Sequence, residues 1–226
     1  MPLAADSVAQ RVATLRERVD EVTVASGREP GSVAILAVTK TQPREAVVAA
    51  LDAGLTDIGE NYVQEARDKY DGLPPCTKHF VGHVQTNKAK AITALFDVVQ
   101  SVDRLDAGLA LAKASRDAGR PLRVLVQVNV SPAERFGAAP AEAPGLAARL
   151  RDLGLDVDGV MAIGPLEGDV DAAFATAREA FEGVGGSTLS LGMSADWERA
   201  VRHGSTMVRL GTAIFGPRPV KERSLA

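Results

Sequence analysis

The chain has 226 residues, 46% of them hydrophobic, which is enough to bury a full core in one large α/β domain or two small ones. Its formal net charge of −3 provides no basic field for nucleic acid, and no polybasic run is present for anionic lipid. The single cysteine, Cys76, excludes an internal disulfide, and no apolar segment approaches the ~20 residues that span a bilayer, so we expect a cytoplasmic protein with neither a nucleic-acid nor a membrane partner.

The first predicted element is a helix over about residues 6–26. Apolar residues recur there at helical spacing, at Val8, Val12, Leu15, Val19 and Val22. Asp6 or Ser7 is placed to cap the first turn, and Gly27 is placed to stop the helix. Charged residues are spread through the same stretch, so it lacks the apolar region of a signal peptide.

After this helix the chain alternates between strand-like and helix-compatible segments. The strand-like segments are Val33–Thr39, Thr56–Gly59, Lys78–Gly82, Val98–Val102, Arg123–Val130, Val157–Ile163, Thr188–Gly192 and Met207–Gly211. The helix-compatible segments lie near Pro43–Ala53, Tyr62–Tyr70, Asn87–Leu95, Arg104–Ala118, Ala143–Leu153, Val170–Gly183 and Asp196–Arg202. Eight strands alternating with seven helices predict βα units and a parallel sheet, and eight strands close a TIM-type barrel. Since no Pro/Ser-rich linker divides residues 1–226, we expect a single (β/α)8 TIM-type barrel domain preceded by the N-terminal helix, with a doubly wound open sheet as the alternative.

Polar residues follow the predicted strands at their C-terminal ends, where the sites of TIM-type barrels lie. They are Lys40 after the first strand, Glu60-Asn61 after the second, His83 after the third, Asn129 and Ser131 at the fifth, Met193-Ser194 after the seventh, and Gly211-Thr212 after the eighth. A random surface would scatter such residues over both ends. The asymmetry therefore predicts a functional site at one mouth of the barrel.

Lys40 ends the first predicted strand and shares its face with Leu36 and Val38, because strand side chains alternate with period two. If that face looks into the barrel, the amine emerges above an apolar layer, and partial desolvation favours the neutral amine that forms Schiff bases. The alternative is a strand-end lysine that extends to solvent, as most such lysines do.

Gly192, Ser194, Gly211 and Thr212 follow the seventh and eighth strands, where barrels often build phosphate sites from backbone N–H groups and hydroxyls. Glycines let the backbone approach an anion, and hydroxyls add donors. The alternative for Ser194 is a part in the cap that Asp196 provides for the next helix.

Arg209 lies inside the last predicted strand, where a buried charge needs a partner. Either a structural salt bridge to an interior carboxylate holds it, or it is a cation beside the pyridine nitrogen of a cofactor. A strand-end amine, a phosphate-sized nest of small residues and a fixed cation are the three groups needed to hold pyridoxal phosphate.

The histidines do not indicate a metal site. His79 and His83 are four residues apart, and in a strand that spacing places them on the same face but about 13 Å apart, without a cysteine or carboxylate in register. His203 is typical of a helix C-terminus. We expect no bound metal.

Five stretches of the chain carry a resemblance to a known family. They are Leu36–Thr41, Ile58–Glu65, His79–Lys88, Met161–Gly164, and Leu191–Asp196 continued through Phe215-Gly216. In these stretches the chain resembles the pyridoxal phosphate homeostasis proteins, which are related to the barrel domain of alanine racemase. One region departs from that pattern: after Val128–Ser131 the family usually continues Gly-Glu-x-x-Lys-x-Gly, whereas this chain reads Pro132–Gly137. The loop at 131–137 is therefore altered, and any role that the family's loop lysine carries is left open for this chain.

The resemblance implies a barrel that holds pyridoxal phosphate as a Schiff base on Lys40. It implies that Ser194, Gly211 and Thr212 hold the phosphate, that Arg209 faces the pyridine nitrogen, and that Asn61 and Met161 lie around the ring. The expected role is intracellular homeostasis of the cofactor by buffering or by delivery to apo-enzymes that use it. We expect a monomer rather than an obligate oligomer, and no robust catalytic turnover.

Two enzymatic alternatives remain. A racemase or lyase needs a second proton-transfer group on the opposite cofactor face, which in alanine racemase-like enzymes comes from across an interface with an extra β domain. This chain offers only Tyr62 and Tyr70 for that part. A Schiff-base aldolase would use Lys40 on a phosphorylated sugar.

Overall fold

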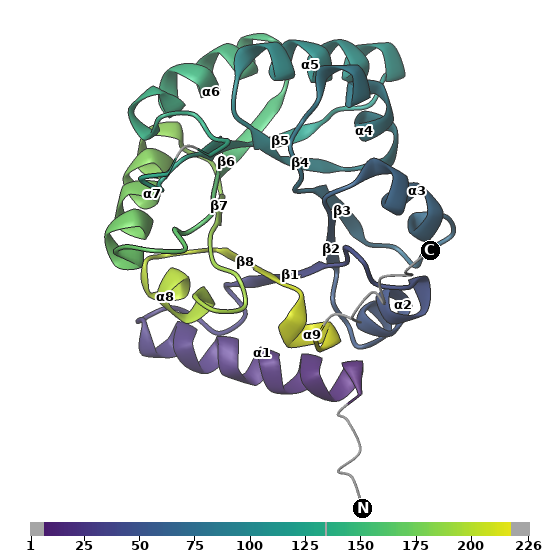
Figure 1. Cartoon of the computed structure of the whole chain (residues 1–226), viewed down its shortest axis with the longest axis vertical. Helices are drawn as coiled ribbons and strands as arrows, with labels where there is room; N and C mark the ends of the chain where they lie inside the picture. The colour runs from purple at the N-terminus through teal and green to yellow at the C-terminus, as the bar shows by residue number, and fades with distance from the viewer. Residues whose placement is uncertain (1–6, 134, 218–226) are drawn as a thin grey trace, which may run out of the picture.

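Eight parallel strands close into a barrel in the computed structural model of the chain, which describes residues 7–133 and 135–217 (Figure 1). Consecutive strands are neighbours, and β8 pairs with β1 to close the ring. The strands are β1 (Ala34–Val38), β2 (Asp57–Glu60), β3 (Thr77–Phe80), β4 (Val98–Val102), β5 (Arg123–Val128), β6 (Asp156–Ala162), β7 (Thr188–Ser190) and β8 (Met207–Leu210). The predicted barrel is confirmed, and the open doubly wound sheet is wrong because β1 and β8 are not edges.

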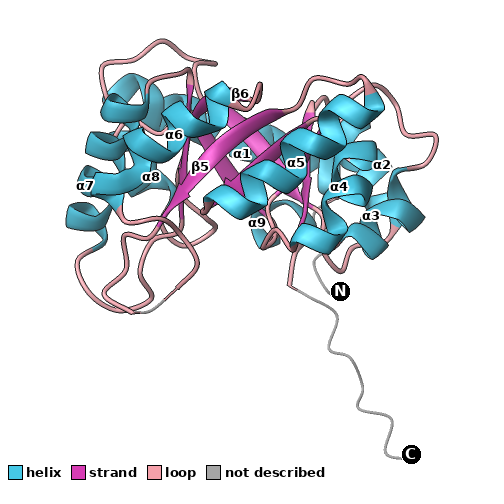
Figure 2. Ribbon diagram, turned by 90° about the horizontal axis from the view of Figure 1, so that it is seen from above, coloured by secondary structure: helices cyan, strands magenta, loops and turns pink. Residues whose placement is uncertain are grey.

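Helices surround the strands on all sides (Figures 1 and 2). They are α1 (Val8–Ala25), α2 (Arg44–Asp52), α3 (Val63–Tyr70), α4 (Ala89–Leu95), α5 (Leu105–Ala118), α6 (Ala143–Asp152), α7 (Val170–Val184), α8 (Trp197–Arg202) and α9 (Thr212–Phe215), with 3-10 turns η1 (Thr86–Lys88) and η2 (Pro140–Glu142). Alternate strand residues face this layer. Ile35 and Ala37 pack in the helix-facing core, whereas the fully buried Leu36 between them faces the barrel interior.

Helix α1 lies outside the βα repeat and packs against α2, α8 and α9. Ser7 caps it: its hydroxyl accepts from the Gln10 N–H, and the Gln10 side chain accepts from the Ser7 N–H, which makes a capping box. Asp6, the other predicted cap, lies outside the described residues. The helix buries the apolar face that its spacing predicts, including Val12 and Val19.

Several strands end earlier than predicted. Strand β3 ends at Phe80 instead of Gly82. At Gly82 the backbone comes close to the residue that follows β2, since a Cβ there would lie 2.0 Å from the Asn61 carbonyl oxygen. His79 and His83 therefore do not share a strand face, which corrects that expectation. Strands β5 and β7 also end early, at Val128 and Ser190.

No helix within the two described ranges is long and apolar enough to cross a membrane. That residues 1–226 form a single domain stays a prediction, because residues 1–6, 134 and 218–226 are not described.

Candidate functional site

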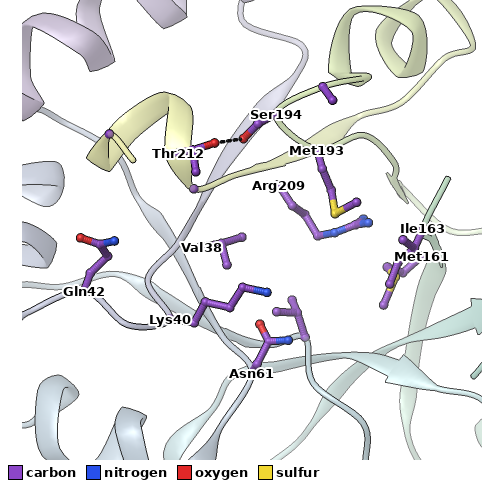
Figure 3. A pocket seen from close by; sticks show the side chains of 14 residues that line it. Val38, Lys40, Gln42, Asn61, Met161, Ile163, Met193, Ser194, Arg209 and Thr212 are labelled. Carbon is purple, nitrogen blue, oxygen red and sulfur yellow. Dashed lines mark hydrogen bonds between the residues drawn. The ribbon is translucent and has the colours of Figure 1, made fainter. Parts of the chain in front are cut away.

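A cavity of about 320 Å³ opens at the C-terminal ends of the strands (Figure 3). All seven residues that were singled out as ligands line it: Lys40, Asn61, Met161, Ser194, Arg209, Gly211 and Thr212. They follow or belong to β1, β2, β6, β7 and β8. Closure of the barrel therefore brings residues of the first strands and of the last strands to one place. Their contacts to a ligand stay a prediction.

The backbone on both sides of Lys40 is held by hydrogen bonds. Thr41 has a left-handed φ of 65°, and its N–H donates to Glu65 Oε2 at 2.8 Å. On the other side, the Thr39 hydroxyl donates to the Gly59 carbonyl at 3.1 Å and lies 2.8 Å from the Tyr70 hydroxyl. The half-buried Lys40 side chain extends into the cavity toward Asn61, which differs from the solvent-directed alternative (Figure 3). The turn therefore presents the amine in a fixed direction.

A buried ion pair lies beneath this turn. Lys69 Nζ donates to Glu60 Oε2 at 2.6 Å and to the Thr39 carbonyl at 2.7 Å, and it also contacts Glu65 Oε2 at 3.1 Å. Glu60 Oε1 accepts from the Asn61 N–H at 2.9 Å, which holds the backbone of Asn61 in place. Sequence reasoning missed Lys69, because a lysine within a short polar helix carries no signal of burial. Glu60 is a support for the site and does not line the cavity.

The end of the cavity that follows β7 and β8 contains two hydroxyls. Thr212 Oγ1 donates to Ser194 Oγ at 2.9 Å (Figure 3). Asp196 accepts from the Met193 N–H at 2.6 Å and closes the turn before α8. Ser194 contacts Thr212 instead, so the two side chains have different roles. Gly192 has a φ of +88°, and a Cβ there would lie 2.8 Å from the Cα of Trp197. The glycine allows α8 to approach the end of β7, but it does not line the cavity.

Arg209 reaches the cavity from within the barrel wall and is 5% exposed. Its Nη1 donates to the Ser190 carbonyl at 2.6 Å and to Ser190 Oγ at 2.9 Å, and its Nη2 donates to the Ala162 carbonyl at 2.7 Å. Burial lowers the pKa of Arg209 to about 10, which the charge of Asp196 opposes, so the guanidinium stays cationic at neutral pH. Its acceptors in the described part of the chain are neutral, so the predicted interior salt bridge is not what holds it.

The rest of the lining is apolar or uncharged. Met161 and Ile163 form one wall, and Gln42 and Met193 are lining residues that the sequence did not single out as ligands. Asn61 Oδ1 is buried without a hydrogen-bond partner, which leaves an acceptor that a ligand can satisfy. Within the described ranges, Lys40 and Arg209 are the only ionisable side chains of the lining.

Other polar residues at this mouth lie outside the cavity. His83 lines a neighbouring hollow with Tyr62, and its ring stacks on Phe136 with centroids 3.8 Å apart. Asn129 lines a third hollow with Phe136, and its side chain accepts from the Ser131 N–H at 2.9 Å. The position of polar residues at strand ends therefore selects the mouth at which this cavity opens, but it also selects residues that do not line the cavity. The described residues contain no group of three or more His, Cys, Asp or Glu side chains that could hold a metal ion.

Comparisons with known proteins agree on one family. The family described as "Alanine racemase, N-terminal domain" matches residues 10–219. A pyridoxal phosphate homeostasis protein of Pseudomonas aeruginosa is 44% identical over 222 residues, which covers 94% of this chain and 96% of the relative. One of Escherichia coli K12 is 38% identical over 233 residues, covering 96% of this chain and all (100%) of the relative.

Solved structures give the same result for the fold. PipY of Synechococcus elongatus PCC7942, with PLP bound, has a TM-score of 0.81 and 33% identity, covering 93% of this chain and 100% of PipY. An alanine racemase of Clostridium difficile has a TM-score of 0.71 at 14% identity, covering 91% of this chain and 56% of the racemase. The second likeness concerns the fold alone.

Proposed function

The chain belongs to the alanine racemase N-terminal domain family and, within it, to the pyridoxal phosphate homeostasis proteins; from this membership we propose that it binds pyridoxal phosphate as a Schiff base on Lys40. The support is a relative of known structure with PLP bound, together with a cavity that gathers an amine, a cation and paired hydroxyls. Pyridoxal phosphate supplies an aldehyde, a phosphate and a pyridine ring that can withdraw electrons.

Each end of the cavity suits one part of this cofactor. Ser194, Thr212 and Gly211 follow β7 and β8, where TIM-type barrels commonly bind phosphate. Lys40 supplies the amine for the aldehyde, and Arg209 supplies a cation for the pyridine nitrogen. Asn61, with its unsatisfied buried oxygen, and Met161 would contact the ring. We propose these roles for all seven residues.

We further propose that the protein binds the cofactor without robust turnover. The observation that carries this is the lining, whose only ionisable side chains among the described residues are Lys40 and Arg209. Tyr62 lines the neighbouring hollow, and burial raises the pKa of Tyr70, which contacts Thr39 instead of the cavity. A guanidinium opposite the pyridine nitrogen disfavours ring protonation, which weakens the ring as an electron acceptor.

The role that follows is homeostasis of the cofactor by buffering it or delivering it to apo-enzymes. A protein with one cysteine in 226 residues fits the cytoplasm, where those enzymes work. We propose that it acts there as a monomer.

Borohydride reduction followed by mass spectrometry of the Lys40 peptide tests the proposal. Protein incubated with pyridoxal phosphate should turn yellow, bleach on reduction and carry a phosphopyridoxyl group on Lys40. Lys40→Ala should abolish the adduct, whereas Lys88→Ala, a change in η1 outside the cavity, should retain it. An adduct retained in Lys40→Ala would overturn the assignment, and turnover of a free amino acid would favour the racemase or lyase alternative.

A further inference from the structure

A line of polar side chains crosses the barrel interior below the cavity, at positions that TIM-type barrels ordinarily fill with branched apolar residues. Arg209 Nη1 donates to Ser190 Oγ at 2.9 Å, and Ser190 Oγ donates to Gln100 Oε1 at 2.8 Å. Gln100 Nε2 lies 2.9 Å from His79 Nδ1, and His79 Nε2 lies 2.9 Å from Asp57 Oδ1. We call these five residues, from β2, β3, β4, β7 and β8, the interior chain.

The hydrogen bonds of the interior chain all run in one direction. Gln100 Nε2 also donates to Met207 Sδ at 3.2 Å, which places the amide nitrogen on the His79 side. An amide nitrogen only donates, so His79 Nδ1 accepts and the imidazole proton is on Nε2, facing Asp57. Donors therefore point from the guanidinium of Arg209 toward the carboxylate of Asp57 at every step.

Burial makes this arrangement cooperative. His79 is 3% exposed, and Gln100 and Ser190 are 0% exposed. A buried polar group that loses its partner retains the full cost of its desolvation, so a change in one member affects its neighbour. Asp57 lines a second cavity of about 240 Å³ at the N-terminal mouth. The interior chain thus connects the two ends of the barrel.

We propose that the interior chain positions Arg209, and that Gln100 and His79 are positioning residues that act on the bound cofactor only through Ser190 and Arg209. The inference rests on the proposed function, because it takes the pyridine ring as the partner of Arg209. The physical reason lies at Ser190. Its hydroxyl has one proton, and because Gln100 Oε1 accepts that proton, the oxygen presents its lone pairs to the guanidinium.

Loss of His79 reaches Arg209 in two steps. Without the His79 acceptor, the Gln100 amide is no longer held in one orientation. Ser190 then loses its fixed acceptor and can rotate its proton toward other carbonyls. The guanidinium is left with the Ser190 and Ala162 carbonyls as its acceptors, so its edge toward the cavity should become less ordered.

The test compares His79→Leu, Ser190→Ala and the double variant, with Leu125→Met as a matched control. Leu125 is fully buried on β5 and faces the barrel interior without belonging to the interior chain. Two readouts are measured: the visible spectrum and dissociation constant of bound pyridoxal phosphate, and hydrogen exchange of the Arg209 guanidinium in the ligand-free protein by NMR. Neither readout requires catalytic activity.

Both single changes should shift the cofactor band in the same direction, weaken binding by on the order of tenfold and accelerate exchange at Arg209. The double variant should be no worse than Ser190→Ala alone, because the interior chain is already broken next to Arg209. Leu125→Met should behave as wild type. Wild-type spectrum and exchange in His79→Leu, or additive effects in the double variant, would overturn the proposal.

A second histidine variant keeps the test decisive if His79→Leu does not fold. His79→Asn retains an acceptor for the Gln100 amide while losing the bond to Asp57, and it should restore most of the Arg209 protection. An Arg209 that exchanges as fast in His79→Asn as in Ser190→Ala would contradict the order of the interior chain. Failure of the Lys40 adduct in otherwise folded protein would instead refute the proposed function, since the exchange readout needs no cofactor.

Discussion

At the scale of single residues, the side chains that line the cavity at the strand ends could be predicted, but the buried side chains that hold them in place could not. Lys40, Ser194 and Thr212 were identifiable because they follow predicted strands where barrel sites lie. Lys69 and Gln100 were not, because their partners come from other elements of the fold. Arg209 was noticed as a charge in a strand, yet its neutral acceptors appear only when β6 and β7 lie beside β8.

Lys69→Met should destabilise the protein strongly. The change leaves the fully buried Glu60 carboxylate without its cation, and breaking a buried ion pair from one side costs about 3–5 kcal/mol. Urea unfolding measures the loss. The double variant Glu60→Gln/Lys69→Met should recover part of it, because no unpaired charge remains. Lys113→Met, which removes an exposed pair with Asp117 on α5, should change little; equal losses for Lys69→Met and Lys113→Met would contradict this role.

At the scale of elements, periodicity located the long helices and missed the shortest. Helix α1 begins at Val8 behind the capping residue that was predicted, Ser7. Helix α9 covers only Thr212–Phe215, too short for an apolar period to emerge. Its position nevertheless matters for the site, since Thr212 and Gly216 at its two ends line the cavity. Predicted strands were too long where an apolar run continues past the last hydrogen bond between neighbouring strands.

Arg11→Met should weaken pyridoxal phosphate binding by up to about tenfold. Arg11 Nε on α1 donates to the Ile214 carbonyl at 2.6 Å, which holds α9 in place below the hydroxyl of Thr212. Equilibrium titration of the cofactor measures the loss. Arg16→Met is the matched control, because Arg16 on the same helix donates to the Ala53 and Gly54 carbonyls at the other mouth. Equal affinities in the two variants would show that α9 does not depend on Arg11.

At the scale of the whole molecule, the alternation of strands and helices was sufficient to predict the closed barrel. Parallel βα units, eight in number, have few ways to bury their apolar faces. The polar residues at the C-terminal strand ends also predicted the mouth at which the cavity opens. What the sequence could not predict is the path of hydrogen bonds inside the ring, because residues such as Asp57 and Ser190 are connected through side chains on two other strands, β3 and β4, only after closure.

The pH dependence of stability should include a contribution from Asp57. Burial alone would raise the pKa of Asp57, but hydrogen bonds from His79 and Thr56 bring it below its ordinary value. A carboxyl whose folded pKa is depressed contributes stability that is fully present above its unfolded value, about 3.9, and is lost as pH falls through the folded value. The wild type should therefore exceed Asp57→Asn in unfolding free energy at neutral pH, and the difference should shrink in acid.

Urea titrations between about pH 7 and pH 3 measure this difference. Asp117→Asn is the control, because Lys113 also lowers the pKa of Asp117 but the pair is exposed to solvent. Its difference from wild type should be small throughout the range, since water and salt screen the pair. A wild-type advantage over Asp57→Asn that does not change with pH would contradict the assignment.

The pairing of β8 with β1 couples ligand binding to closure of the ring. Lys40 lies just beyond β1, whereas Arg209 and Thr212 lie on and just beyond β8. A ligand that contacts both groups binds the closed ring in preference to an opened one, so its binding free energy adds to the cohesion of that seam. During synthesis the amine emerges from the ribosome long before its partners. A nascent chain therefore exposes Lys40 before the cavity exists, and a ligand that contacts both groups can bind only after the last strand has formed.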